Sequence, residues 1–367
     1  MSSLQAGWRI AGGLLALVVL YLLLWPVPID PVRWDAPADA GLVDPFESND
    51  ILQRTALIDL GGHQGPEDVA VGPDGLIYAS TADGFILRVA PGGGHVEPFA
   101  ETGGRPLGIE FDATGNLLVA NSWSGIQKVA PDGSVTVLAD TYDGQAIEYA
   151  NDLAVAADGT IYFSDSSSKF GAREWGGSYE ASVLDILEHG GHGRIFALDP
   201  RTGEMTVIED GINYANGVAI SDDNAYLLVC ETGSYRVWRY WLTGSRAGQR
   251  ETIISNLPGF PDNINNGMNG RFWIGLVAPR NALLDRLAGK PWLRKVVQRL
   301  PASLRPAAVP SSHVFAINGD GQVLMNLQDP HAGLPALTGA VETRNAIFLS
   351  SLFGNRLGRL DKDRLVR

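Results

Sequence analysis

The chain has 367 residues, of which 45% are hydrophobic, and its 44 glycines and 21 prolines fall in turn-like pairs that favour many short strands. Its 28 basic and 41 acidic residues give a formal net charge of −13, whose field repels a phosphate backbone and argues against nucleic-acid binding. The single cysteine, Cys230, excludes an intramolecular disulfide and any multi-cysteine zinc or iron–sulfur site.

The first predicted element is an apolar helix near the N-terminus. Residues 10–29 form a run of 20 uncharged residues, which is about the length that crosses a hydrocarbon core as a helix. Pro26 and Pro28 predict that the helix ends near Trp25. We therefore predict a membrane anchor over residues 1–29.

The residues that flank this segment predict its orientation. Arg9 precedes it, whereas residues 30–39 contain three aspartates and one arginine, and this slight bias favours a cytoplasmic N-terminus with the rest periplasmic or extracytoplasmic. No small-x-small cleavage site follows the apolar run. We predict a single-pass membrane protein in which Trp8–Trp25 contacts lipid as an uncleaved signal anchor, and a cleaved secretory peptide is the alternative. Residues 30–50 are expected to form a linker.

A repeated pattern of short strands occupies the rest of the chain. Its six units begin at Gly65, Arg105, Ala150, Ala215, Pro261 and Ala336. Each contains an inner strand, a turn such as Asp74-Gly75, a second strand and two further strands, and Asp-Gly between alternating strands is a strong hairpin signal. Six such units predict an all-β, six-bladed β-propeller over residues 51–367. Residues 51–62 are expected to supply the outer strand that closes the last blade.

Two insertions interrupt the repeat, at residues 172–192 and residues 281–310. The second has leucines and valines at helical spacing, which predicts a short helical insertion. Seven basic residues and one acidic residue give residues 280–305 a local charge of about +6. Together with Trp292, this charge allows two interpretations: a segment that lies on the membrane surface, or a helical cover packed on the propeller.

Polar residues gather where the inner strands begin. The residues at these six positions are Glu67, Leu107, Asn151, Asn216, Asp262 with Asn263, and Thr338. Inner strands of a propeller line its central channel, so these side chains are expected to converge. Two carboxylates and three amide carbonyls are hard oxygen ligands of the kind that Ca²⁺ prefers. The alternative for any single asparagine is a turn cap, but turn chemistry does not require the same position in several blades.

Strand alternation excludes two further carboxylates from this set. Asp68 and Asp152 neighbour Glu67 and Asn151, so their side chains are expected to point to the opposite face. His189 and His192, in the first insertion, are a weaker candidate pair for zinc. The sequence contains no Gly-x-Ser-x-Gly elbow, phosphate loop or His-Glu-x-x-His motif.

Several segments resemble the strictosidine synthase-like family, which includes the adipocyte plasma membrane-associated proteins. They are "GPEDVAV", "GRPLGI", "NDLAV" with "IYFSDSSSKF", "ANGVAIS" and "GFPDNI", and the resemblance extends from about Ile51 to Leu360. The wider superfamily contains paraoxonases, gluconolactonases and diisopropyl-fluorophosphatase. The resemblance implies a propeller with calcium in its central channel. The metal ligands that it implies are Glu67, Asn151, Asn216, Asp262 and Asn263.

The sequence departs from its relatives at three positions. Thr338 stands where the plant synthase has its catalytic glutamate, which makes carbon–nitrogen bond formation the least favoured activity. Leu107 and Ser122 stand at or near the positions of a paraoxonase histidine pair. These three residues are expected to line a substrate pocket.

The functional expectation is a calcium-dependent hydrolase of small hydrophobic esters or lactones, similar to an arylesterase or lactonase. Calcium is expected to act as a Lewis acid, and Asp262 as the base or nucleophile. The alternative is a propeller that binds a ligand or partner without catalysis and uses calcium only for structure.

Overall fold

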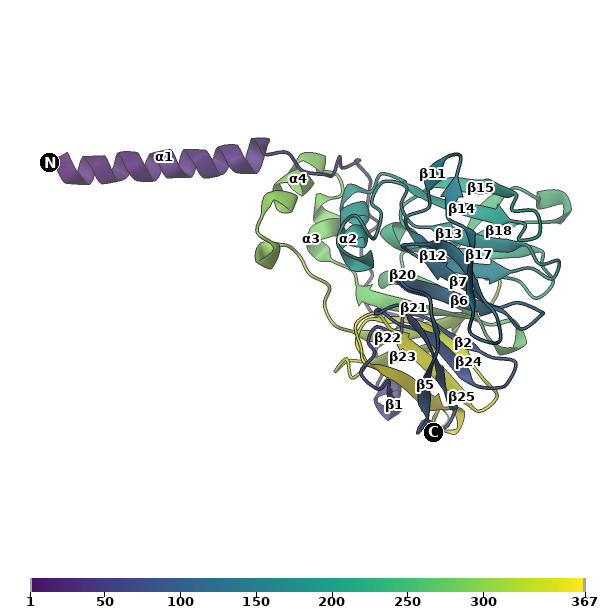
Figure 1. Cartoon of the computed structure of the whole chain (residues 1–367). Coiled ribbons are helices and arrows are strands. Elements are labelled where there is room, and N and C mark those ends of the chain that lie inside the picture. The colour runs from purple at the N-terminus through teal and green to yellow at the C-terminus, as the bar shows by residue number, and fades with distance from the viewer. Residues whose placement is uncertain (1, 366–367) are drawn as a thin grey trace.

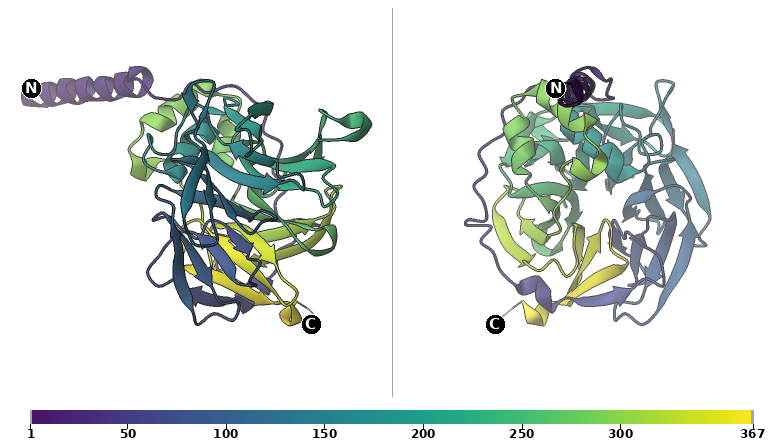
Figure 2. Two further views of the ribbon diagram at one scale, coloured as in Figure 1. Left: turned by 45° about the vertical axis from the view of Figure 1, so that its right-hand side comes forward. Right: turned by 90° about the vertical axis from the view of Figure 1, so that its left-hand side faces the viewer.

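The fold is a six-bladed β-propeller with an N-terminal helix that projects from one side (Figure 1). The computed structural model describes residues 2–365. Six four-stranded antiparallel sheets surround a central axis, and the right-hand view of Figure 2 shows the ring face-on. The predicted fold class is therefore confirmed.

The first three blades follow the chain from the innermost strand outward. Blade 1 comprises β2 (Val69–Val71), β3 (Ile77–Ser80), β4 (Phe85–Val89) and β5 (Val96–Glu101). Blade 2 comprises β6 (Pro106–Phe111), β7 (Leu117–Asn121), β8 (Gly125–Val129) and β9 (Val135–Ala139). Blade 3 comprises β12 (Ala150–Val155), β13 (Ile161–Asp165), β14 (Gly193–Leu198) and β15 (Met205–Ile212). A small hairpin, β10 (Thr141–Tyr142) and β11 (Gln145–Ala146), precedes blade 3.

The last three blades repeat this order until the final strand. Blade 4 comprises β16 (Ala215–Ile220), β17 (Tyr226–Glu231), β18 (Arg236–Trp241) and β19 (Arg250–Ile254). Blade 5 comprises β20 (Gly259–Asn266), β21 (Phe272–Pro279), β22 (Ser312–Ile317) and β23 (Val323–Asp329). Blade 6 comprises β24 (Leu337–Glu342), β25 (Ala346–Ser351), β26 (Arg356–Asp361) and the early strand β1 (Ala56–Asp59).

The ring is closed by strands from the two ends of the propeller sequence. β1 pairs antiparallel with β26, with Ala56 opposite Arg359 and Asp59 opposite Arg356. Residues 51–62 therefore supply the closing outer strand, as the sequence predicts. Because one blade contains strands from both ends, the ring cannot open without breaking this ladder.

The N-terminal helix is long and apolar enough to cross a membrane. It is α1 (Ser2–Leu24), and the part over Gly7–Leu24 has a mean hydropathy of 2.0 and is not buried by the rest of the protein. Residues 30–50 contain no helix or strand, but they are not a free linker. Backbone hydrogen bonds join Val32 to Glu188 and Trp34 to Ala288. Figure 2 shows the segment following the outside of the ring.

Both insertions form helices on the side of the ring from which α1 leaves (Figure 1). The first contains α2 (Ser178–Glu188), which the sequence did not predict, and the second contains α3 (Ala282–Leu287) and α4 (Pro291–Arg299). Asn281 caps α3 by accepting hydrogen bonds from the next backbone amides, and Pro291 opens α4. The helical insertion is thus a cover over one face of the propeller. The described residues also contain six short 3₁₀ helices: η1 (Ile51–Arg54), η2 (Thr232–Ser234), η3 (Gly244–Arg246), η4 (Met268–Gly270), η5 (Ala302–Leu304) and η6 (Lys362–Arg364).

Candidate functional site

A cavity of about 180 Å³ lies between the helical cover and the starts of the inner strands. Its polar residues include four of the five predicted ligands, Glu67, Asn151, Asn216 and Asp262. Its other walls are largely apolar and come from α2, α3, α4 and neighbouring loops. A mostly apolar pocket with a few convergent polar groups is typical of a small-molecule site.

Asn151, Asn216 and Asp262 sit at register irregularities of the inner strands, whereas Glu67 lies just before β2, whose pairing with β3 has no such shift. The pairing shifts between Ala150 and Leu153 in blade 3 and between Ala215 and Val218 in blade 4. Blades 2, 5 and 6 have the same kind of shift at the equivalent place. Such bulges interrupt the ladder and re-aim side chains. An asparagine, which disfavours regular strands, is therefore tolerated at these positions and its side chain is directed at the cavity.

Hydrogen bonds fix the direction of the two cavity amides. The Nδ2 of Asn151 donates to the Oγ of Ser166 at 2.8 Å. The Nδ2 of Asn216 donates to the Oγ1 of Thr232 at 3.0 Å and to Oδ1 of Asp262 at 2.6 Å. Because both amide nitrogens are engaged, the Oδ1 atoms of the two asparagines face away from these partners.

Asn263 lies deeper than the other predicted ligands. It is fully buried and is not among the cavity-lining residues. Its Nδ2 donates to the backbone oxygen of Glu67 at 3.0 Å and to Oε1 of the same residue at 3.2 Å. The structure therefore brings all five predicted ligands to one end of the channel, with four at the cavity and Asn263 against Glu67.

Four oxygens of this group are buried without a hydrogen-bond partner. They are Oε2 of Glu67 and the Oδ1 atoms of Asn151, Asn216 and Asn263. Buried polar atoms in proteins nearly always have a partner, so four orphaned acceptors need an explanation. Residues 2–365 contain no cluster of three or more His, Cys, Asp or Glu side chains suited to a metal, so a cation here depends on the amide oxygens. The donor set of two carboxylates and three amides fits calcium.

The pKa shifts of the carboxylates in this cluster also support a bound cation. Burial, together with the nearby charges of Asp262 and Asp68, raises the pKa of Glu67 well above its usual value. Burial also raises the pKa of Asp262 to about 7, although the hydrogen bond from Asn216 opposes this shift. Two buried carboxylates that share one site need a positive charge nearby to stay ionised. Arg105 is buried close to them and lowers both pKa values in part.

The three predicted pocket residues have different environments. Leu107 lines the cavity. Ser122 and Thr338 do not line it: the Oγ of Ser122 donates to the backbone oxygen of Arg105, and the Oγ1 of Thr338 donates to the backbone oxygen of Glu67. Thr338 therefore supports the cluster from behind and does not replace the plant synthase's glutamate as a group facing substrate.

Two cavity tyrosines were missed in the sequence. Tyr149 and Tyr214 both line the cavity, and the hydroxyl of Tyr214 donates to that of Tyr149, which donates in turn to the backbone oxygen of Ser178. The sequence contained a signal for them, because each opens a Tyr-Ala-Asn triplet that ends in a cavity asparagine, Asn151 or Asn216. A repeated triplet indicates that its first residue has an equivalent place in two blades.

The excluded carboxylates join neighbouring blades. Oδ2 of Asp68 accepts from the backbone amide of Ile109 at 2.9 Å, and Oδ2 of Asp152 accepts from that of Val218 at 2.8 Å. Each bond connects the inner strand of one blade to that of the next. These side chains therefore have partners of their own, consistent with leaving them out of the cavity cluster.

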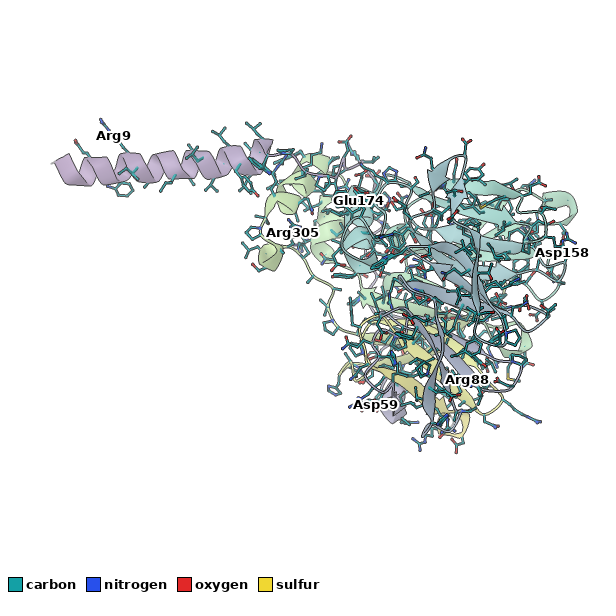
Figure 3. All side chains as sticks on the ribbon, in the orientation of Figure 1. Arg9, Asp59, Arg88, Asp158, Glu174 and Arg305 are labelled. Atoms are coloured by element: carbon teal, nitrogen blue, oxygen red, sulfur yellow. The ribbon has the colours of Figure 1, made fainter. Side chains whose placement is uncertain are left out.

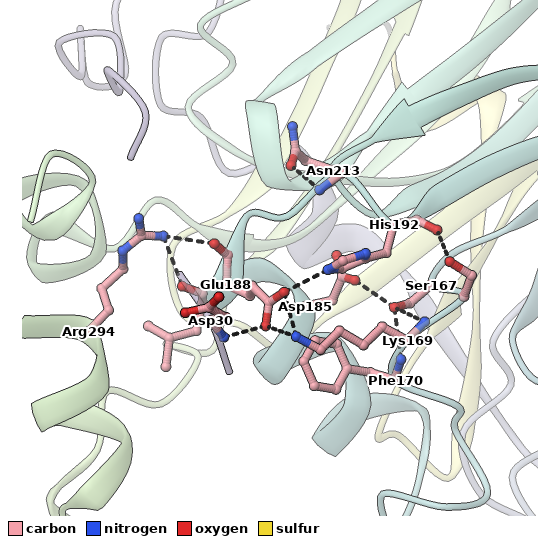
Figure 4. Close-up of polar contacts among 12 residues, drawn as sticks. Asp30, Ser167, Lys169, Phe170, Asp185, Glu188, His192, Asn213 and Arg294 are labelled. Atoms are coloured by element: carbon pink, nitrogen blue, oxygen red, sulfur yellow. Dashed lines mark hydrogen bonds and ion pairs between the residues drawn. The ribbon is translucent and has the colours of Figure 1, made fainter. Parts of the chain in front are cut away.

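The two histidines of the first insertion do not converge. His189 stacks on Trp34 with ring centroids 4.1 Å apart, whereas Nε2 of His192 lies 2.7 Å from Oε1 of Glu188. Figure 4 shows Glu188 between His192, the ammonium of Lys169 and the backbone of Asp30. Glu188 thus fastens the segment after α1 to α2, and the histidine pair is not a metal site.

Comparisons with known proteins agree with this architecture. A family model described as "Strictosidine synthase" matches residues 151–245, and one described as "Strictosidine synthase-like, N-terminal" matches residues 44–89. Strictosidine synthase-like protein 6 of Arabidopsis thaliana is 31% identical over 326 residues, covering 87% of this chain and 85% of its own. The adipocyte plasma membrane-associated protein of Salmo salar is 32% identical over 374 residues, covering 95% of this chain and 87% of its own.

Solved structures with low sequence identity share the fold. A gluconolactonase from Xanthomonas campestris superposes with a TM-score of 0.62 at 20% identity, covering 91% of this chain and 96% of that one. Regucalcin from Agrobacterium tumefaciens, described as a calcium-binding protein, gives a TM-score of 0.57 at 13% identity, covering 83% and 93%. These two solved structures share the propeller fold with this chain, and the curated relatives have higher sequence identity to it. The chain therefore belongs to the strictosidine synthase-like family.

Proposed function

We propose that the protein is a calcium-dependent hydrolase of esters or lactones, anchored in a membrane by α1 with its N-terminus in the cytoplasm and its propeller outside. One observation carries the proposal: three residues that line an apolar cavity in the central channel, Glu67, Asn151 and Asn216, and Asn263 behind them, each have a buried oxygen without a hydrogen-bond partner. The likeness of the fold to a gluconolactonase and to a calcium-binding regucalcin supports it.

The ligands of the ion are the five oxygen-bearing side chains already described. They are Glu67, Asn151, Asn216, Asp262 and Asn263. When bound, calcium would supply a Lewis acid that polarises a substrate carbonyl and stabilises the negative charge that develops on its oxygen. The amide hydrogen bonds of Asn151 and Asn216 hold their oxygens in place before substrate binds.

The protein's own groups account for the remaining steps. The apolar walls bind the hydrocarbon part of the substrate and exclude bulk water. Asp262, held by the Nδ2 of Asn216, accepts a proton from a water molecule as that water's oxygen bonds to the acyl carbon. The acyl carbon–oxygen bond then breaks, and the leaving oxygen takes the proton back from Asp262. The products are a carboxylic acid and an alcohol, or a hydroxy acid from a lactone.

A second candidate, ligand binding without turnover, is favoured by a different feature of the cavity. Within residues 2–365, the side chains that line it include no histidine, lysine or cysteine. The carboxylates that line it in the described part of the chain, Glu67 and Asp262, are both proposed metal ligands, so a carboxylate base would also have to bind the ion. A propeller with structural calcium and an inert apolar pocket satisfies the same geometry.

Turnover measurements on the full-length protein separate the two candidates. We expect calcium-dependent hydrolysis of phenyl acetate and simple lactones, with a loss of about 100-fold or more on chelation or in Asp262→Asn. Asp222→Asn, the same change at an exposed aspartate, is the control and should leave the rate unchanged. Turnover that is unchanged by chelator and by Asp262→Asn contradicts the calcium-dependent mechanism. A melting temperature that falls on chelation, without any turnover, supports the binding protein.

A further inference from the structure

The cavity opens to the surface through apolar side chains. Leu283 of α3, Val309 and Phe353 line the cavity, yet they are 45%, 60% and 53% exposed. Residues that line a cavity and are also exposed mark its mouth. A substrate therefore passes apolar side chains on its way to Glu67 and Asp262.

The same insertion exposes further large apolar residues. Trp292 of α4 is 60% exposed and Leu304 of η5 is 65% exposed. Soluble proteins rarely expose large apolar surfaces, and such surfaces mark contacts with a membrane or a partner. The insertion that covers the cavity is therefore suited to contact with an apolar phase.

The membrane-spanning candidate helix is attached to this insertion. The hydroxyl of Tyr21 in α1 donates to the backbone oxygen of Arg299 in α4 at 3.1 Å, and Nη1 of Arg299 donates to the backbone oxygen of Leu22 at 3.0 Å. Just after α1, Asp30 forms an ion pair with Lys295 at 2.8 Å. These contacts hold α4 next to the point where the chain leaves α1.

The mouth and the anchor face the same way. The right-hand view of Figure 2 looks along α1 and into the ring of blades. In Figure 3, the cavity-lining Arg305 lies on the side of the propeller from which α1 leaves. A membrane crossed by α1 thus lies opposite the mouth of the cavity.

The face of the insertion near the mouth of the cavity is suited to apolar contact and does not depend on charge alone. Of the seven basic residues in this segment, Arg280, Arg294 and Arg299 are buried and donate to backbone oxygens. They hold the insertion to its neighbours and cannot form a solvated basic face. Arg286 and Lys290 are exposed. Three of the seven predicted basic residues are therefore used inside the fold and do not contribute to a basic surface.

We propose that the mouth of the cavity lies in the interfacial layer of the membrane that α1 crosses, and that the substrate is an amphiphilic ester or lactone with a long acyl chain drawn from that bilayer. This inference rests on the hydrolase function proposed above. The acyl chain lies against Leu283, Val309 and Phe353, and the carbonyl group reaches Asp262. Hydrocarbon that is already in the bilayer reaches these side chains without crossing water, which favours long chains over short ones.

Membrane contact can be measured without reference to activity. The full-length Leu304→Cys variant is labelled with the fluorophore NBD and reconstituted into phosphatidylcholine vesicles. We expect lipids that carry a doxyl group on the acyl chain to quench the NBD fluorescence. Leu324→Cys is the matched control, because Leu324 is an exposed leucine on the outer strand β23. Quenching at Leu304 but not at Leu324 supports the inference, and equal or absent quenching overturns it.

Substrate delivery is tested with two esters of one alcohol. The palmitate and the acetate of 4-methylumbelliferone are compared in the same vesicles, with the double variant Trp292→Asp, Leu304→Asp and the control Leu324→Asp. Neither Trp292 nor Leu304 lines the cavity. We expect the double variant to lower palmitate turnover by about tenfold while acetate turnover is unchanged.

Failure of the inference differs from failure of the proposed function. Acetate turnover with an unaltered palmitate rate in the double variant overturns membrane delivery and keeps the hydrolase. No turnover of either ester, with quenching intact, overturns the hydrolase and the substrate assignment and leaves only the membrane contact. The melting temperatures of all variants are compared first, so that a folding defect is not read as lost delivery.

Discussion

Asn216 links the two kinds of ligand in the site. Its Nδ2 lies 2.6 Å from Oδ1 of Asp262, and its own Oδ1 is buried without a partner. The amide therefore satisfies one carboxylate oxygen and offers a neutral oxygen to a cation. This arrangement limits the negative charge that the buried site contains when no ion is bound.

Replacing that amide by a carboxylate tests this role. Asn216→Asp places two carboxylates in contact, so we expect the calcium-free protein to lose about 2 kcal/mol or more of its free energy of unfolding. Calcium should restore much of this loss, because the added charge strengthens attraction to the ion. The measurement is chemical denaturation with calcium and with chelator, and Asn318→Asp in an exposed turn is the control. Equal stability of Asn216→Asp and wild type in chelator contradicts the role.

At the scale of elements, the helical cover depends on contacts made by the segment after α1. His189, in the left-handed conformation at the end of α2 with φ 55°, stacks on Trp34. Burial lowers its pKa to about 3, and the charges of Arg294 and Arg236 add to the shift. The ring is therefore neutral in the folded protein at neutral pH.

This shift makes stability depend on pH. Below the usual histidine pKa of about 6.5 the unfolded chain binds a proton that folded His189 does not bind until pH falls to about 3. The free energy of unfolding should therefore fall by about 1 kcal/mol per pH unit between pH 6.5 and 4 from this residue. Asparagine tolerates the left-handed backbone at this position. His189→Asn should therefore remove this residue's contribution to the pH dependence of the free energy of unfolding.

Chemical denaturation at pH 7.5, 6 and 5 gives the slope directly. If His189→Asn loses the same stability at every pH, only the missing ring stack is responsible. If the slope of the free energy of unfolding against pH also changes, the titration of His189 contributes to stability. The exposed His95→Asn is the control and should keep the wild-type slope. A wild-type slope in His189→Asn would show that the ring titrates normally.

Much of the fold could be predicted because each blade carries local signals. Turns such as Asp74-Gly75 and the alternation around them lie within a few residues of one another, and six copies define the ring. α2 could not be predicted, because the apolar side of its short segment is defined by packing against distant residues such as Leu284 of α3 and Tyr214. The docked path of residues 30–50 likewise depends on partners far away in sequence, such as Glu188 and Ala288.

The site was predictable in composition but not in geometry. The oxygen-bearing residues could be found because blade repetition puts equivalent positions at one axis. The bulges that aim them could not be found, because they follow from how neighbouring inner strands fit together. Gly217 illustrates this fit: a Cβ atom there would lie 2.4 Å from the backbone nitrogen of Ile264, so only glycine lets blades 4 and 5 approach.

At the scale of the whole molecule, the ring is needed because no blade contains the site. Glu67 comes from blade 1, Asn151 from blade 3, Asn216 from blade 4, and Asp262 and Asn263 from blade 5. Side-chain bonds such as that from Asn263 to the backbone of Glu67 cross between blades that are far apart in sequence. An ion held by this set would tie four of the six blades together, so ion binding and propeller stability are expected to be coupled.

The most direct test of the account is calorimetric titration of calcium into the metal-free, full-length protein, combined with thermal melts of the same samples. We expect one ion per chain, with about 2.7 kcal/mol of added stability when free calcium is 100 times Kd and a melting temperature raised by about 3 to 4 °C. Asp262→Asn should abolish both effects, and Asp222→Asn should keep them. No heat of binding and no shift in melting temperature in the wild type would contradict the calcium site and, with it, the proposed chemistry.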